Sequence, residues 1–91
     1  MENMRAFADY ILHGMENAKD KQRFYDARSA LVDYELLHGS RDFVTYHEGL
    51  IADFQRDAAE CDDCEQAYFI AMRVGQCRNA LAVWREWCSG T

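Results

Sequence analysis

Between Cys64 and Cys88, apolar residues recur at alternating spacings of three and four, which is the pattern of one continuous helix face. A second apolar row lies beside the first and is interrupted only by Gln76. A helix that is apolar on two adjacent faces must be covered from more than one side. The pattern therefore predicts a long helix that is either the centre of a bundle or half of an oligomer interface. The first row is Ala67, Ile70, Val74, Cys77, Leu81, Trp84 and Cys88, and the second is Phe69, Met72, Ala80, Val83 and Trp87.

The rest of the chain has the composition of a small helical protein. It has 91 residues, which is the size of one domain, and 49% of them are hydrophobic, enough to fill a core. Proline is absent, which favours long helices joined by short turns. We therefore predict a single all-α domain over residues 1–91, a compact antiparallel bundle of three to four helices with the long C-terminal helix at its centre.

Apolar periodicity and capping residues predict helices near 3–13, 17–38, 41–60 and 63–88. Gly14 is expected to end the first helix, although it is a weaker stop than Gly39, so the alternative is that the first two helices merge or kink there. The expected N-caps are Asn17, Ser40 and Asp62, the last in a capping box with Glu65. The fourth helix is expected to continue through Gly75, which lies off both apolar rows, with a close helix neighbour as one reason for a glycine there.

Four cysteines raise the question of disulfides or a metal. Cys77 and Cys88 lie eleven residues apart on one helix, too far to bond, so we expect reduced thiols and a cytoplasmic protein without a bound metal or cofactor. Cys61 and Cys64 have a spacing that suits zinc or a reactive pair, and in an up-down bundle His13 would approach them. A metal-binding or redox module that uses these residues is therefore the alternative function.

The other histidines carry little chemistry. Glu35 and His38 have the spacing of half a di-iron motif, but no second pair accompanies them. We expect His38 to lie at a helix end and His47 to be a partly exposed helix residue. No nucleophile motif or phosphate-binding loop is present, so we expect no enzymatic activity.

The acidic residues are concentrated between positions 53 and 65, where six acids accompany the single Arg56. Such a surface repels nucleic acid and attracts basic protein surfaces. With a net charge of −6 and scattered arginines, a nucleic-acid-associated regulator is only the third possibility. No stretch is long and apolar enough to span a membrane, and the first residues do not have the pattern of a secretory signal.

These features favour a small acidic protein-interaction module, an adaptor, regulator or inhibitor of another protein, and a homodimer. Its size, acidity and helicity are similar to those of many phage and mobile-element proteins that inhibit host machinery, anti-CRISPR proteins among them. This likeness covers no motif, so it assigns no residue a role. The expected partner-binding residues are Phe69, Val83, Trp87, Asp53, Asp57, Glu60, Asp62 and Asp63.

Overall fold

Four α-helices make up the chain that the computed structural model describes, residues 2–38 and 42–90, of which the side chains at 2, 3, 37 and 38 are left undescribed. No strand occurs in those ranges, and the all-α prediction is confirmed. The helices are α1 (Glu2–Asn17), α2 (Gln22–His38), α3 (Phe43–Glu60) and α4 (Cys64–Gly90).

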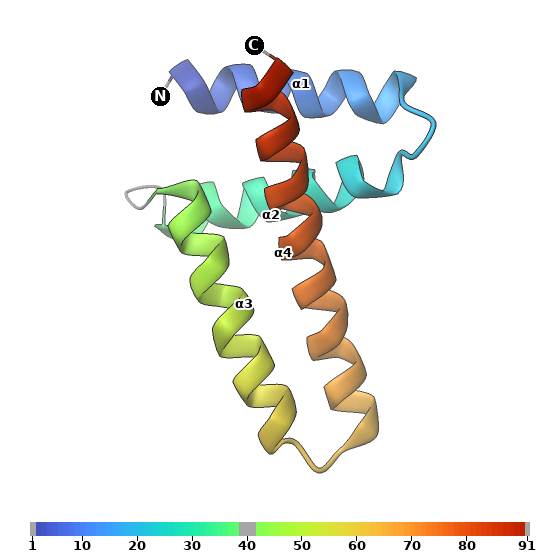
Figure 1. The fold of residues 1–91 in the computed structure, drawn as a ribbon, viewed down its shortest axis with the longest axis vertical. Coiled ribbons are helices and arrows are strands. Elements are labelled where there is room, and N and C mark those ends of the chain that lie inside the picture. The colour runs from blue at the N-terminus through green and yellow to red at the C-terminus, as the bar shows by residue number, and fades with distance from the viewer. Residues whose placement is uncertain (1, 39–41, 91) are drawn as a thin grey trace.

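The helices form two antiparallel pairs that cross each other (Figure 1). α1 and α2 lie side by side as one layer, and α3 and α4 form a hairpin. The upper half of α4 lies across that layer, whereas α3 reaches the layer only at its own N-terminal end, beside α2. α4 contacts all three other helices, so the long C-terminal helix is central, as predicted. The lower half of the hairpin extends beyond the α1–α2 layer and lengthens the molecule to 42 × 31 × 22 Å.

Aromatic side chains from all four helices form the centre of the core. Phe7 of α1 makes edge-to-face contacts with Phe43 of α3 and Trp84 of α4, with ring centroids 5.3 and 4.8 Å apart. Phe43 in turn stacks on Trp84 at 4.8 Å and meets Tyr34 of α2 at 5.3 Å. Such pairs stabilise a core by about 0.5–1.5 kcal/mol each beyond the area they bury. Trp84 therefore packs against the core, as the first apolar row predicts.

Three polar contacts fix α4 across α2. Arg23 forms an ion pair with Glu86, the amide of Asn79 donates to Asp26 Oδ2 at 2.7 Å, and Arg73 pairs with Asp33 at 3.3 Å. The three contacts follow one another along α2 at intervals of three and seven residues. Their partners follow in reverse order along α4, at intervals of seven and six residues. Because these groups come from fixed positions on both helices, they set the register of the crossing as well as adding modestly to stability.

The prediction that Gly14 ends the first helix is wrong. α1 continues to Asn17, and no described glycine has a positive φ, so Gly14 is not a left-handed cap. Gly14 is buried against the ring of Phe24, and a Cβ at this position would lie within 2.6 Å of three ring carbons. Close approach of α2, rather than backbone freedom, explains this glycine.

Two predicted caps also need correction. Asn17 ends α1 and donates to the His13 carbonyl, while the Lys21 carbonyl receives the first amides of α2. Asp63, rather than Asp62, caps α4, because its Oδ1 accepts from the amides of residues 65 and 66 at 2.9 and 3.4 Å. The Asp42 side chain caps α3 through the amide of Thr45. The predicted caps Ser40 and Gly39 lie outside the described residues.

The prediction that the last helix continues through Gly75 is confirmed, since α4 is helical from Cys64 to Gly90. The expected reason for the glycine is wrong, because a Cβ built there meets nothing within 4 Å. Nothing in the structure explains a glycine at this position.

Candidate protein-binding surfaces

The projecting half of the α3–α4 hairpin has no buried side chain. We call residues 51–73 the arm and the remaining described residues the head. Every described residue that is buried lies in the head, and the arm contributes only half-buried and exposed positions. Two helices that pack only on each other bury one face each and leave their remaining faces in solvent. In the arm, α3 and α4 therefore lack the second layer that α1 and α2 provide in the head.

The second apolar row of α4 passes from the covered head into the uncovered arm. Ala80 and Val83 are fully buried under α1 and α2, and Trp87 is half-buried against Phe7 with ring centroids 5.3 Å apart. Phe69 precedes Val83 by fourteen residues, almost four turns, so it lies on the same face of the helix. Phe69 is nevertheless 55% exposed, because the α1–α2 layer does not extend that far.

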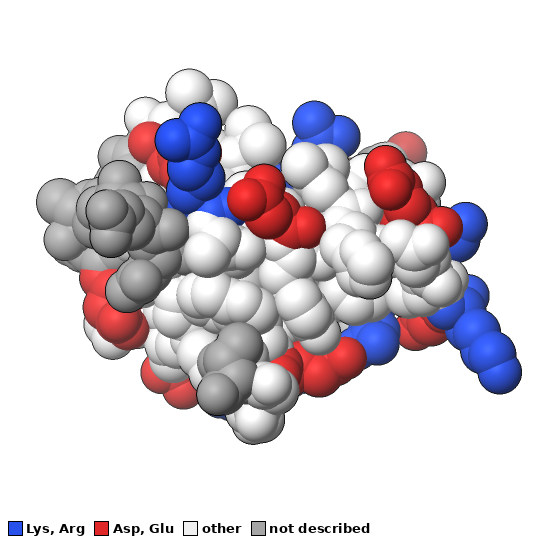
Figure 2. Space-filling view, turned by 90° about the horizontal axis from the view of Figure 1, so that it is seen from above, with Lys and Arg blue, Asp and Glu red and all other residues white. Residues whose placement is uncertain are grey.

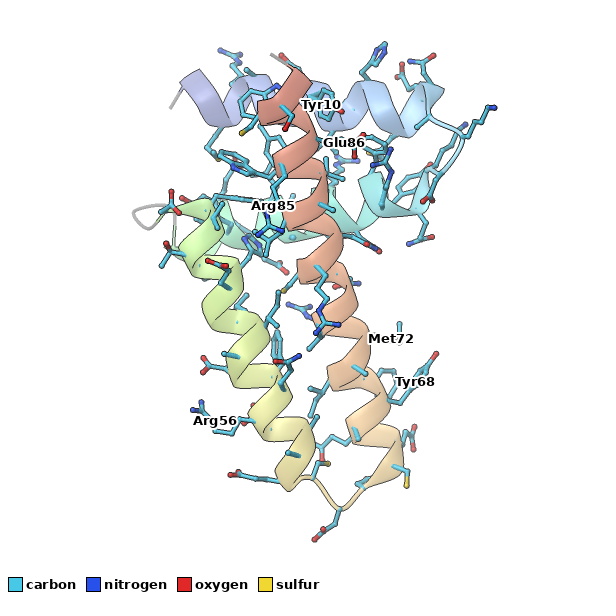
Figure 3. The ribbon with its side chains drawn as sticks, in the orientation of Figure 1. Tyr10, Arg56, Tyr68, Met72, Arg85 and Glu86 are labelled. Atoms are coloured by element: carbon cyan, nitrogen blue, oxygen red, sulfur yellow. The ribbon has the colours of Figure 1, made fainter. Side chains whose placement is uncertain are left out.

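Two more large side chains widen this exposed surface. Tyr68 and Met72 are 63% and 47% exposed, and they project from the side of α4 that faces away from α3 (Figure 3). We call Tyr68, Phe69 and Met72 the arm patch. At roughly 200 Å² for each fully exposed large side chain, these fractions leave about 300 Å² of apolar side chain in water. That area is in the range of the largest patch on a typical monomer, which is often functional.

The predicted set of partner-binding residues is therefore only partly accessible. Phe69 is exposed, as a binding residue must be. Val83 is 0% exposed in the core, so its assignment to a partner-binding surface is wrong. Trp87 is half-buried by the protein's own α1 and offers a partner little surface.

The predicted acidic residues are all exposed and lie on the arm and its tip. Asp53, Asp57 and Glu60 follow Tyr46 by seven, eleven and fourteen residues, so they share the side of α3 on which Tyr46 meets Tyr34 of α2 at 5.4 Å. This is the side of the hairpin from which the α1–α2 layer is missing in the arm. Asp53 is paired with Arg56 at 2.8 Å, while Asp57 and Glu60 form no ion pair with another described residue.

At the arm tip, Asp62 and Asp63 form the loop between the two helices, and Asp63 also caps α4. With Glu65 they bring the arm to six acids against Arg56 and Arg73, a formal charge of −4 out of −6 for the whole chain. The arm is thus the most acidic part of the protein.

The three candidate metal ligands are not brought together. Cys61 and Cys64 lie at the tip of the arm, whereas His13 lies in α1 at the opposite end of the molecule (Figure 1). The expected convergence assumed four parallel helix axes, and it fails because α1 crosses α4 in the head. The Cys61 thiol instead donates to the Asp63 carbonyl at 3.3 Å. Among the described residues, no three His, Cys, Asp or Glu side chains are grouped as a metal site.

His47 is buried, so its expected partial exposure is wrong. It is 1% exposed, its Nδ1 donates to the Phe43 carbonyl at 2.8 Å, and its ring lies 4.3 Å from that of Phe43. Burial lowers the pKa of His47, although the carbonyls of Phe43 and Ala30 and the charge of Asp33 oppose this shift. The imidazole is therefore a neutral core group at physiological pH. His38, the other predicted helix-end histidine, has no described side chain.

Sequence reasoning missed a second uncovered surface, on the outer side of α2. Tyr25, Val32 and Leu36 are 48%, 45% and 77% exposed, and they lie opposite the core residues of the same helix. Their spacing of seven and four residues is itself a helical apolar row. The core row of Phe24, Ala27, Leu31 and Tyr34 already accounts for one face of this helix, so the sequence pattern alone does not single out a second row.

The described arginines form no continuous basic surface on the face seen from above. Arg78 and Arg85 line a shallow groove between α3 and α4, and Figure 3 shows Arg85 between the two helices. Viewed from above, the head shows acidic and basic side chains interspersed with a broad uncharged area (Figure 2). Nucleic-acid binding needs a continuous basic surface, which this face does not have.

Comparison with protein-family models, curated proteins and solved structures finds no match to this chain. No helix in the described ranges has both the length and the apolar character needed to cross a membrane.

Proposed function

We propose that this protein is a non-enzymatic interaction module that binds another protein through its arm, and so acts as an adaptor, regulator or inhibitor. The observation that carries the proposal is that the second apolar row of α4 continues, as Phe69, beyond the layer that covers it in the head.

The energetic argument is one of incomplete burial. At about 25 cal/mol per Å², covering the roughly 300 Å² of the arm patch would contribute on the order of 7 kcal/mol before the costs of association. A partner element that packs beside α4 in the arm would take the place that α1 and α2 occupy in the head.

Charge favours a basic partner. The acids of α3 lie on the same side of the hairpin as Phe69, so an element that covers Phe69 would meet Asp57 and Glu60 as well. An amphipathic segment with an apolar face and flanking Lys or Arg would match this surface, and the acids would accelerate its association at low salt.

The thiols fit a reducing compartment. Cys61, Cys64 and Cys77 are free, and burial raises the pKa of the Cys77 thiol, which makes that thiol unreactive. We therefore place the proposed interaction in the cytoplasm. The separation of His13 from Cys61 and Cys64 gives the metal alternative no support.

The proposal is tested by site-specific photo-crosslinking in cells of the natural host. A benzophenone amino acid replaces Phe69 in one variant and Ala71 in the other. Both positions are exposed and both lie in the arm, but they lie on nearly opposite sides of α4. We expect a discrete crosslinked protein from position 69 and not from position 71.

Substitution provides the matched affinity measurement. Phe69→Glu should abolish capture of that protein, and Ala71→Glu, which adds the same charge to the same arm, should leave capture unchanged. Equal crosslinking from both positions, or capture that survives Phe69→Glu, would contradict the proposal.

A further inference from the structure

The outer face of α2 is an apolar surface that the proposed function does not use. Tyr25, Ser29, Val32 and Leu36 follow one another at spacings of four, three and four residues, which is the spacing of a helix-packing seam. All four are exposed, and Leu36 is the most exposed large apolar side chain described, at 77%. The seam lies opposite the core face of α2, and no other part of the chain that the structure describes covers it.

α1 extends this surface on one side. Leu12 is 45% exposed, and a groove of about 180 Å³ lies between the two helices, lined by Leu12, Leu31 and Val32 among others. The seam and the groove are adjacent, because Val32 belongs to both. A helix packed on the seam would therefore also cover part of the groove.

The charges along this edge identify the occupant. Arg28 and Glu35 line the same groove, both are exposed, and neither pairs with another described residue. They occupy the same position in successive heptads, about 10 Å apart along the axis, so they do not reach each other within one chain. An antiparallel copy of the same helix would place Arg28 beside the partner subunit's Glu35, and Glu35 beside the partner subunit's Arg28.

We propose that a second copy of this chain packs on the outer face of α2, with the two α2 helices antiparallel about a two-fold axis between Ser29 and Val32. In this arrangement Tyr25 lies over the partner subunit's Leu36, and the reverse contact follows by symmetry. Such a contact is isologous and closes on itself, so it gives a dimer and not a filament.

Antiparallel pairing is preferred because it satisfies the charges that are still free. A parallel pair would bring Arg28 toward the partner subunit's Asp33, but Asp33 is already bound to Arg73, and Asp26 on the same edge is bound to Asn79. Antiparallel pairing brings Asp26 near the partner subunit's Asp33, but Asp33 is neutralised there by Arg73, and both contacts with α4 stay in place.

The area is sufficient for a modest dimer. α2 is about 25 Å long, and with α1 beside it the face is about 20 Å wide, so each copy would bury roughly 500 Å² or more. The total of about 1,000 Å² is near the lower limit of specific interfaces. We therefore expect a dissociation constant in the micromolar range. The dimer leaves both arms uncovered, and the inference does not depend on the proposed function of the arm.

Sedimentation equilibrium at about 1–200 μM tests the proposal. The wild type should move from the 10.6 kDa mass toward twice that mass as concentration rises. Leu36→Glu should remain monomeric, with an unchanged helical circular-dichroism spectrum because the side chain is exposed. Phe69→Glu is the matched control in the arm patch, and it should dimerise like the wild type.

A charge exchange tests the orientation. Arg28→Glu and Glu35→Arg should each weaken dimerisation about tenfold, because each places like charges together twice in the dimer. The double variant R28E/E35R should restore it. A wild type that stays monomeric at 200 μM, or a dimer that Phe69→Glu disrupts and Leu36→Glu does not, would overturn the proposal. Failure of the double variant to restore dimerisation would overturn the antiparallel arrangement.

Discussion

Substitution of Gly14 by alanine should destabilise the protein, contrary to what alanine ordinarily does in a helix. In the middle of an exposed helix, this change gains about 1 kcal/mol. At Gly14 the added Cβ would lie within 2.6 Å of Cδ1, Cε1 and Cζ of Phe24, a ring that is only 3% exposed. The ring also carries Arg23 over its face at 4.7 Å and packs against Tyr10 at 5.9 Å, so it has little room to retreat.

The size of the effect follows from two opposing terms. Forcing a methyl group into a packed core costs about 1–3 kcal/mol, which exceeds the propensity gain. We therefore expect a net loss of up to about 2 kcal/mol, which lowers the Tm of a domain of this size by up to about 10 °C. Thermal unfolding followed by circular dichroism, at one fixed protein concentration, measures it.

Two other helical glycines provide the control. A Cβ at Gly49 or Gly75 would meet nothing within 4 Å, so Gly49→Ala and Gly75→Ala should raise the free energy of unfolding by up to about 1 kcal/mol. If Gly14→Ala were as stabilising as these two changes, the close packing of α1 on α2 at Gly14 would be refuted.

Three further predictions concern the core of the head. In the unfolded state His47 binds a proton below about pH 6.5, whereas in the native state its lowered pKa delays protonation to a lower pH. The free energy of unfolding should therefore fall as the pH drops from 7 through 6.5, by at most about 1.4 kcal/mol per pH unit. Urea titrations across this range should show the slope, and His47→Gln should remove it. Trp84→Ala should cost about 3–5 kcal/mol and largely unfold the protein by circular dichroism, because its ring contacts both Phe7 and Phe43. Cys77 should react with a thiol reagent in denaturant but not in the native state, because its side chain is 4% exposed and burial raises its pKa. Rapid labelling of Cys77 in the native protein, located by mass spectrometry, would contradict its burial.

The corrected expectations have two physical origins. Cap positions shifted by one to several residues because several Asx or glycine residues near each helix end compete locally, and the packing of neighbouring helices decides among them. His13 does not approach Cys61 and Cys64, because short loops fix only that successive helices reverse direction, and not the angle at which one pair crosses the other.

The sequence by itself determined the helices and the double apolar character of the last one, because periodicity and the absence of proline act locally along the chain. It also identified Phe69 and the acids of the arm as surface residues. Only the tertiary structure decided which half of the second apolar row is covered. Val83 and Phe69 are equivalent in sequence pattern, and they differ because α1 and α2 cross α4 at one end alone. The same crossing leaves the outer side of α2 in water, since burial depends on non-local packing that no local pattern specifies.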